Sequence, residues 1–176
     1  MSTQALMLVV VAMAAPPEPA LQPLATGSFV LVEGPAAYEP RLDQAVEQGM
    51  DSLPFVIKPL ARLRLKPAVY ETVCPELSLA LSTEILDVSC GGAQAPFSRR
   101  LDGSDGPIMD DGDPYQVRIE HGPDWVSLRI SGDKGGQTNR YVFQPDGSMV
   151  LHATIFSSYL PDDLNWTLRY RRAGAS

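Results

Sequence analysis

Between about Pro75 and Arg172, apolar and polar side chains alternate in steps of two, which is the period of a β-strand with one buried face. The alternation is clearest over residues 115–120, 126–130, 149–155 and 164–171. Turn-forming sequences separate these runs, among them Asp102-Gly103, Asp105-Gly106, Asp111-Gly112 and Pro145-Asp146-Gly147. The pattern predicts an antiparallel meander of about eight strands. Because an open meander exposes its apolar face and its edges, we expect a barrel or a sheet wrapped around a helix.

A second period precedes the meander, over residues 41–65. Apolar residues recur there at an average step of 3.6, at Leu42, Val46, Met50, Leu53, Ile57 and Leu60. Pro40 suits the first helical position, whereas Pro54 and Pro59 lack the N–H that a helix interior needs. We therefore expect an amphipathic helix in two pieces, ending near Leu65 and basic in its later half. The predicted fold class is α+β, mainly β, with this helix packed on a lipocalin-like barrel or a strongly curved sheet.

The N-terminal region differs in composition from the rest of the chain. Residues 5–15 are all apolar, and prolines follow at 16, 17 and 19. This run is too short to cross a bilayer, but it suits the core of a secretory signal peptide over residues 1–20, with small residues at Ala12 and Ala14 for cleavage. Residues 21–40 read as a Pro/Ala-rich linker with a short strand, before one globular domain over 41–172. We expect a periplasmic or secreted protein; the alternative is a buried apolar segment of a cytosolic one.

Two cysteines, Cys74 and Cys90, flank a segment that reads as a hairpin. A tight turn near Ser82 would place Leu79 opposite Ile85 and both cysteines at the open end of the same ladder. An oxidising compartment would then allow a disulfide between them. The alternative is a pair of buried thiols. The sequence has no CxxC motif, so we expect no thiolate metal site.

Composition excludes several classes of function. The 176 residues carry a net charge of −7, which argues against a nucleic-acid partner, and no second long apolar run suggests an integral membrane protein. Catalytic and nucleotide-binding motifs are absent, and the two histidines, His121 and His152, fall in a turn and on the polar face of a strand. The aspartates between 102 and 113 fit turns better than the EF-hand spacing. We expect a monomeric non-enzyme without a metal or cofactor.

Arginines of the helix and the late strands form the candidate binding site. If the helix packs along the sheet, arginines from both would converge on a carboxylate or phosphate, which guanidinium groups bind in pairs. Aromatic side chains of the same strands would line an apolar cavity. The predicted ligand-binding residues are Arg62, Arg64, Arg140, Tyr141, Trp166, Arg169 and Tyr170. The alternative is that the arginines are solvated or paired with carboxylates and the aromatic residues are ordinary core.

Three segments carry a resemblance to a known group of proteins: residues 101–108, residues 138–151, and the closing 168–172 (LRYRR). Over roughly the last 100 residues the chain resembles exported, uncharacterised bacterial proteins with a lipocalin-like antiparallel meander. The resemblance implies a small barrel with a ligand cavity and no catalytic residues. The predicted function is binding of a small amphipathic, lipid-like or anionic ligand. The alternative is an envelope structural or interaction protein whose solid barrel carries the basic helix as a docking surface.

Overall fold

The computed structural model describes residues 26–91, 96–110 and 112–174. Two helices and ten strands form the fold, in the order β1 (Gly27–Leu31), α1 (Pro35–Gly49), α2 (Lys58–Tyr70), β2 (Glu76–Leu81), β3 (Ile85–Cys90), β4 (Phe97–Arg100), β5 (Ile108–Asp110), β6 (Asp113–His121), β7 (Trp125–Gly132), β8 (Gly135–Phe143), β9 (Met149–Ser157) and β10 (Leu164–Arg172). The mainly-β α+β class expected from the sequence is confirmed. The meander after Pro75 has nine strands, β2–β10, where about eight were expected, and β1 precedes them.

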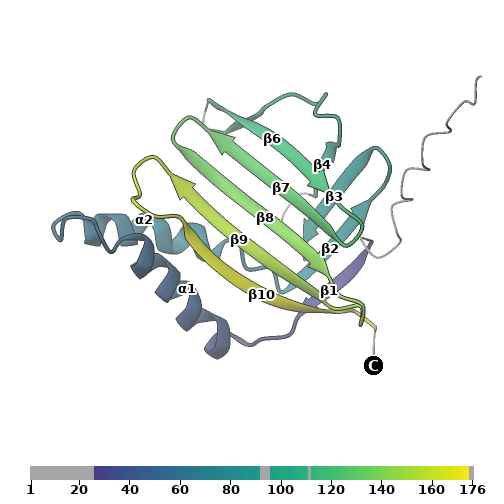
Figure 1. Cartoon of the computed structure of the whole chain (residues 1–176), viewed down its shortest axis with the longest axis horizontal. Helices are drawn as coiled ribbons and strands as arrows, with labels where there is room; N and C mark the ends of the chain where they lie inside the picture. The colour runs from purple at the N-terminus through teal and green to yellow at the C-terminus, as the bar shows by residue number, and fades with distance from the viewer. Residues whose placement is uncertain (1–25, 92–95, 111, 175–176) are drawn as a thin grey trace, which may run out of the picture.

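All ten strands belong to one antiparallel sheet in the order β4-β3-β2-β1-β10-β9-β8-β7-β6-β5. Strand β1 joins the two halves, since it pairs with β10 on one side and β2 on the other. The sheet curls so that β1–β4 lie across from β6–β10 (Figure 1). Strands β4 and β5 are its two edges. The result is a strongly curved half-barrel, one of the two sheet forms that the meander predicts.

The alternation places one set of side chains inside the curl. Along β10 every second residue is buried and every other one is exposed, and β9 pairs with β10 in a register that keeps the buried positions together. The enclosed core takes residues from both halves of the sheet and from α1, including Phe29, Leu42, Leu79, Leu86, Leu128, Met149, Leu151, Leu164, Leu168 and Tyr170. Burial of this apolar face is what the period of two in the sequence encodes.

Helix α1 closes one end of the curl by packing against β10 (Figure 1). Its buried residues are Leu42, Ala45, Val46 and Gly49, and the following Met50 is buried as well. The helix begins at Pro35 rather than at Pro40, so the linker expected over 21–40 holds a strand and the first turn of a helix. Pro40 therefore lies inside the helix. Packing of the Leu42–Val46 face against the sheet outweighs the lost backbone hydrogen bond.

Helix α2 lies beside α1 and is far less buried. The expected split of the helix is present, with Pro54 in the connection and Pro59 in the first turn of α2. The helix extends to Tyr70, beyond the expected end at Leu65, and its one buried residue is Val69. Ile57 and Leu60, which share the apolar period of α1 in sequence, are exposed. No helix in the described part of the chain is long and apolar enough to cross a membrane.

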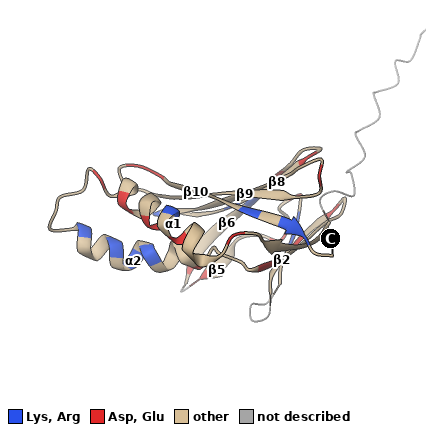
Figure 2. Ribbon diagram, turned by 90° about the horizontal axis from the view of Figure 1, so that it is seen from below, with Lys and Arg blue, Asp and Glu red and all other residues tan. Residues whose placement is uncertain are grey.

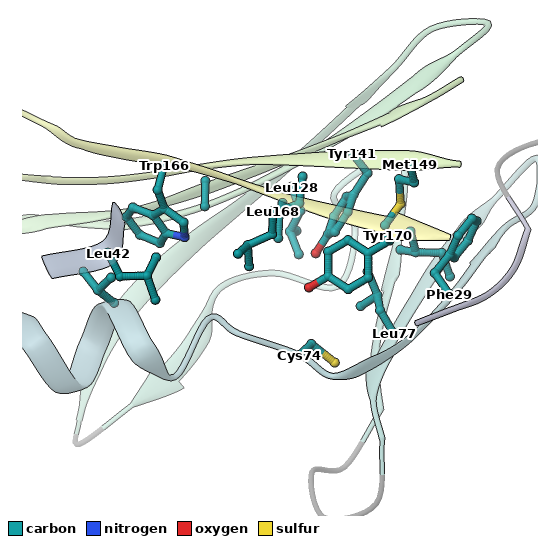
Figure 3. Packing of buried hydrophobic residues seen from close by; sticks show 14 of the residues in the cluster. Phe29, Leu42, Cys74, Leu77, Leu128, Tyr141, Met149, Trp166, Leu168 and Tyr170 are labelled. Carbon is teal, nitrogen blue, oxygen red and sulfur yellow. The ribbon is translucent and has the colours of Figure 1, made fainter. Parts of the chain in front are cut away.

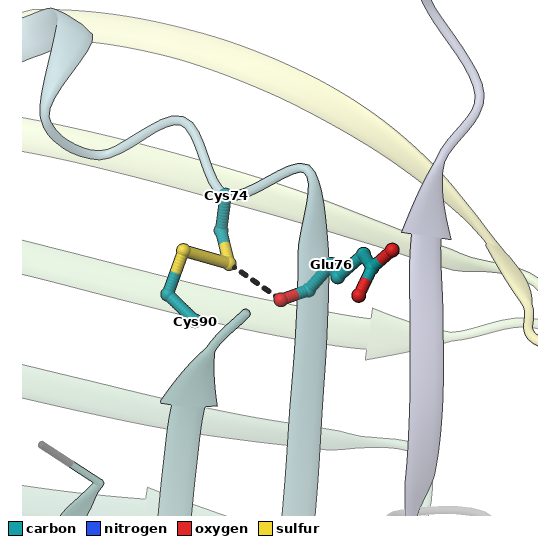
Figure 4. The surroundings of a disulfide bond; sticks show 3 residues. All are labelled: Cys74, Glu76 and Cys90. Carbon is teal, nitrogen blue, oxygen red and sulfur yellow. Dashed lines mark hydrogen bonds between the residues drawn. A yellow bond between two sulfur atoms is a disulfide. The ribbon is translucent and has the colours of Figure 1, made fainter. Parts of the chain in front are cut away.

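Cys74 and Cys90 form the expected disulfide, with their Cα atoms 5.4 Å apart (Figure 4). The register expected for the hairpin is wrong. Leu79 pairs with Val88 rather than Ile85, and Cys90 lies opposite Leu77. A wider turn causes this shift, because the Ser82 hydroxyl accepts hydrogen bonds from the backbone of Glu84 and Ile85. Cys74 thus lies before β2, and the bond ties the exit of α2 to the end of β3.

The predicted signal peptide, residues 1–20, lies outside the described residues. The short strand expected after it is β1, which begins at Gly27.

Candidate functional site

A cavity of about 400 Å³ lies inside the curled sheet, below the C-terminal end of α2. Both halves of the sheet line it: Leu77, Val88, Cys90 and Phe97 from β2–β4, and Leu128, Ile130, Gln137, Asn139, Tyr141, Leu151 and Tyr170 from β7–β10. Ala68, Glu71 and Thr72, with Cys74 of the disulfide, form its remaining wall. Its volume is within the range of small-molecule sites.

Tyr141 and Tyr170 bring two phenol groups to this cavity from different strands. Their hydroxyls point toward the same space between the sheet and Cys74 (Figure 3). Both residues are buried, and the Tyr170 hydroxyl has no hydrogen-bond partner of normal geometry within the described structure. Burial raises the pKa of Tyr170 to about 12, with the Cys74 backbone offsetting part of the shift. Burial, and next the Tyr170 phenol, raise the pKa of Tyr141 as well, so both side chains stay neutral donors at physiological pH.

Two polar residues of β8, Gln137 and Asn139, also line the cavity. The Gln137 amide nitrogen donates a hydrogen bond of 2.9 Å to the Asn139 side-chain oxygen. Neither residue is among those expected from the sequence. The alternation in the sequence does indicate their position, because both residues are an even number of positions from Tyr141 and Phe143 along the strand and therefore share the same inner face. Both are half-buried, so their amide groups are available for hydrogen bonding on the inner face of the sheet.

Trp166 also faces inward, but it packs at the end of the curled sheet that α1 closes, beside Leu42 (Figure 3). It is only 6% exposed, and its indole Nε1 has no hydrogen-bond partner in the part of the chain described. It lines a second hollow of about 370 Å³ with residues of α1, including Arg41, Gln44 and Gln48. Arg41 there is paired with Glu33. The structure thus separates Trp166 from the cavity that holds the two tyrosines.

The four arginines predicted for the site are not brought together. Arg140 and Arg169 are exposed on strands whose alternate residues, Tyr141 and Tyr170, face inward, so they lie on the outer face of the sheet. Arg140 stacks over the Trp125 ring at 4.2 Å. Arg62 and Arg64 are exposed on α2, and Arg62 is paired with Glu47 of α1 at 2.6 Å. Pairing with a carboxylate is the alternative that the sequence left open for these residues.

Other candidate groups also lie away from the cavity. His121 ends β6, and His152 is exposed on β9. In the aspartate-rich segment the Asp102 carboxylate accepts a hydrogen bond from the Ser104 N–H, which is turn chemistry. Within residues 26–91, 96–110 and 112–174, no group of three or more His, Cys, Asp or Glu side chains is placed to hold a metal ion.

Comparison with known proteins gives likeness of shape only. No protein-family model matches the chain, and no curated protein matches it in sequence. Among solved structures, a "REP1-NXSQ fatty acid transporter" is similar over 86% of this chain and 97% of that one, with 12% identity and a TM-score of 0.48. Human cRBP IV is similar over 84% of this chain and 97% of that one, with 13% identity and a TM-score of 0.41.

Proposed function

We propose that the protein binds a small amphipathic, lipid-like molecule inside the curled sheet. The observation that carries the proposal is the Tyr170 hydroxyl, which is buried without a hydrogen bond of normal geometry at the wall of a cavity of about 400 Å³ that is lined by both apolar and polar side chains. An unpartnered buried hydroxyl costs free energy in the empty protein, and a ligand that hydrogen-bonds to it recovers that cost. The apolar side chains around it would hold the body of the molecule.

The polar end of this ligand is neutral in our proposal. Among the described residues lining the cavity, Glu71 is the one charged group, and none is Lys, Arg or His. A buried carboxylate or phosphate would therefore lack a counter-charge, which makes its burial costly. Tyr141, Tyr170, Gln137 and Asn139 instead supply hydroxyl and amide groups. An alcohol, an ester or a protonated acid fits these groups better than the anionic end expected from the arginines.

We further propose that the protein acts outside the cytosol, in the periplasm or as a secreted protein. The disulfide between Cys74 and Cys90 supports this, since such bonds persist in oxidising compartments. A binding rather than a catalytic role is supported by the position of both histidines away from the cavity.

Displacement of a polarity-sensitive dye from delipidated protein tests the ligand proposal. We expect a long-chain alcohol to displace the dye at lower concentration than the fatty acid of equal length at neutral pH. Asn139→Leu should weaken alcohol binding by up to about tenfold, because one hydrogen bond is worth about 1 kcal/mol. Arg169→Gln, on the outer face, is the matched control and should leave binding unchanged. Failure of every apolar dye and lipid to bind would exclude the proposal.

A further inference from the structure

Exposed large hydrophobic side chains are concentrated around α2. Of the eight such residues in the described structure, five lie between 55 and 63: Phe55, Val56, Ile57, Leu60 and Leu63, called here the α2 apolar surface. Phe55 is 83% exposed, Leu63 72% and Val56 69%. Single exposed apolar residues are ordinary, but five within residues 55–63 are a concentration of the kind found at interaction sites.

The α2 apolar surface faces away from the core. Leu60 lies nine residues before Val69, the one buried residue of α2, and nine residues make two and a half helical turns. The two side chains therefore lie on opposite sides of the helix. An ordinary surface helix turns its polar side outward, whereas α2 turns leucines outward. The outer side of this helix is thus suited to meet an apolar environment.

Cations accompany this surface. Helix α2 carries Lys58, Arg62, Arg64 and Lys66 and no acidic residue, although the whole chain has a net charge of −7 (Figure 2). Arg62 and Lys66 pair with Glu47 and Asp43 of the neighbouring α1. Arg64 forms no ion pair with any described residue. Apolar side chains flanked by cations are the combination that binds the interface of an anionic bilayer.

We propose that α2 and the loop before it dock onto an anionic lipid bilayer, with the α2 apolar surface entering the headgroup region and Arg64 meeting lipid charges. A second copy of the chain is a poorer occupant, because a two-fold contact through this surface would set the cations of one α2 against those of the other. The docking rests on the outer side of α2 and the loop before it, and it is independent of the ligand proposed for the cavity.

Sedimentation of the full chain with lipid vesicles tests the docking. We expect binding to vesicles of phosphatidylcholine mixed with phosphatidylglycerol, weaker binding to phosphatidylcholine alone, and a decrease with added salt. The double variant Leu60→Asp/Leu63→Asp should lose more than about tenfold in partitioning. Its matched control is Met109→Asp/Tyr159→Asp, which adds the same charges at exposed apolar residues elsewhere, 62% and 68% exposed.

A charge reversal and a fluorescence probe complete the test. Arg64→Glu should weaken binding to anionic vesicles by at least about fivefold, the effect of roughly one cation near a charged surface, whereas Arg169→Glu on β10 should change it less. In the variant Phe55→Trp, the new indole should shift to the blue on binding and be quenched by brominated lipid.

Three results would each overturn the docking: sedimentation with neither vesicle type, equal losses for the Leu60/Leu63 and Met109/Tyr159 variants, or no blue shift of the new indole when the Phe55→Trp variant is bound. A concentration-dependent dimer that the Leu60/Leu63 variant abolishes would assign the surface to a second copy instead. Circular dichroism of each variant confirms that it is folded, and all the changed side chains are exposed.

Discussion

A single hydroxyl, that of Tyr170, distinguishes the cavity from ordinary core. If the Tyr170 hydroxyl serves to bind a ligand, its removal should stabilise the empty protein and weaken ligand binding. Tyr170→Phe should raise the free energy of unfolding of the empty protein by about 0.5–1 kcal/mol, since it removes a buried hydroxyl that has no hydrogen bond of normal geometry. The same change should weaken binding of a long-chain alcohol. Urea unfolding and dye displacement on one preparation measure both effects.

A loss of stability in Tyr170→Phe would show that the hydroxyl has a partner in the empty protein. Tyr141→Phe is the useful comparison, because the Tyr141 phenol has the Asn139 side chain as a neighbouring hydrogen-bonding group, which lowers its pKa against the larger effect of burial. We expect that variant to lose stability, in contrast to Tyr170→Phe.

Gly49, at the C-terminal end of α1, sets how closely the helix approaches β10. A Cβ there would lie 2.6 Å from Leu164 Cδ1, and Leu164 is fully buried, so its side chain would have to shift within the packed core. Alanine in place of glycine gains about 1 kcal/mol in helix propensity, but overpacking costs about 1–3 kcal/mol. Gly49→Ala should therefore destabilise the protein by about 1 kcal/mol in thermal or urea unfolding. A gain in stability would mean that α1 moves freely against the sheet.

For single residues, the sequence predicts which side chains face inward better than it predicts which inward side chains contact one another. The alternation alone implies that Arg140 and Tyr141, as neighbours in one strand, face opposite sides of the sheet. Placing both in one site therefore conflicts with the strand prediction itself. The positions of Gln137 and Asn139 were predictable from the same alternation. The separation of Trp166 from Tyr170 was not, because it depends on where α1 packs.

Among the elements, the segment from the end of α2 to β3 depends on the disulfide. The bond closes a loop with a sequence separation of 16, for which the loss of chain entropy in the unfolded state is worth about 3 kcal/mol. Cys74→Ser/Cys90→Ser should lose roughly this amount in urea unfolding. Reductant should destabilise the native protein to a similar extent and leave the variant unchanged. An equal response of both proteins to reductant would contradict this role.

The contact between α1 and α2 includes two exposed ion pairs. The hydrogen bond from Lys66 lowers the pKa of Asp43, and that from Arg62 lowers the pKa of Glu47. Because folding lowers both values, the unfolded chain binds more protons in acid. The stabilisation is present above the ordinary carboxyl values of about 3.9 and 4.3 and is lost as pH falls through the lower folded values.

Comparison of the native chain with Asp43→Asn/Glu47→Gln isolates this effect. The native protein should be modestly more stable at neutral pH, and the two stability curves should converge below about pH 4. Trp166, which packs beside α1, reports the transition by fluorescence in a Trp125→Phe background. If the stability curves of the two proteins stay parallel down to low pH, these ion pairs contribute nothing to the pH dependence of stability.

The elements also show where sequence reasoning reaches its limit. Strands, their order along the chain and the split of the helix follow from local patterns. The hairpin register does not, because the Ser82 side chain sets a wider turn. The outward leucines of α2 were also missed, since a period of 3.6 identifies an apolar stripe but not what that stripe contacts.

At the scale of the whole molecule, charge and shape are arranged unevenly. An acidic chain carries its basic helix across one end of a half-barrel, while Glu71 is the one charged residue among those described around the cavity. Cations are therefore available outside, on α2 and the outer face of the sheet, and not around the proposed ligand. The net charge alone shows neither feature.

A cavity without cations should bind a fatty acid in its protonated form. In water the carboxyl is ionised at neutral pH, and burial without a counter-charge favours the neutral acid, which raises the pKa of the bound ligand. Affinity for a fatty acid should thus increase up to about tenfold for each pH unit between about 8 and 5, whereas affinity for the alcohol of equal length stays flat. Glu71→Gln should keep this slope, which assigns the titration to the ligand. Tight, pH-independent binding of the anion would instead show that a cation reaches the cavity, as the arginines in the sequence first suggested.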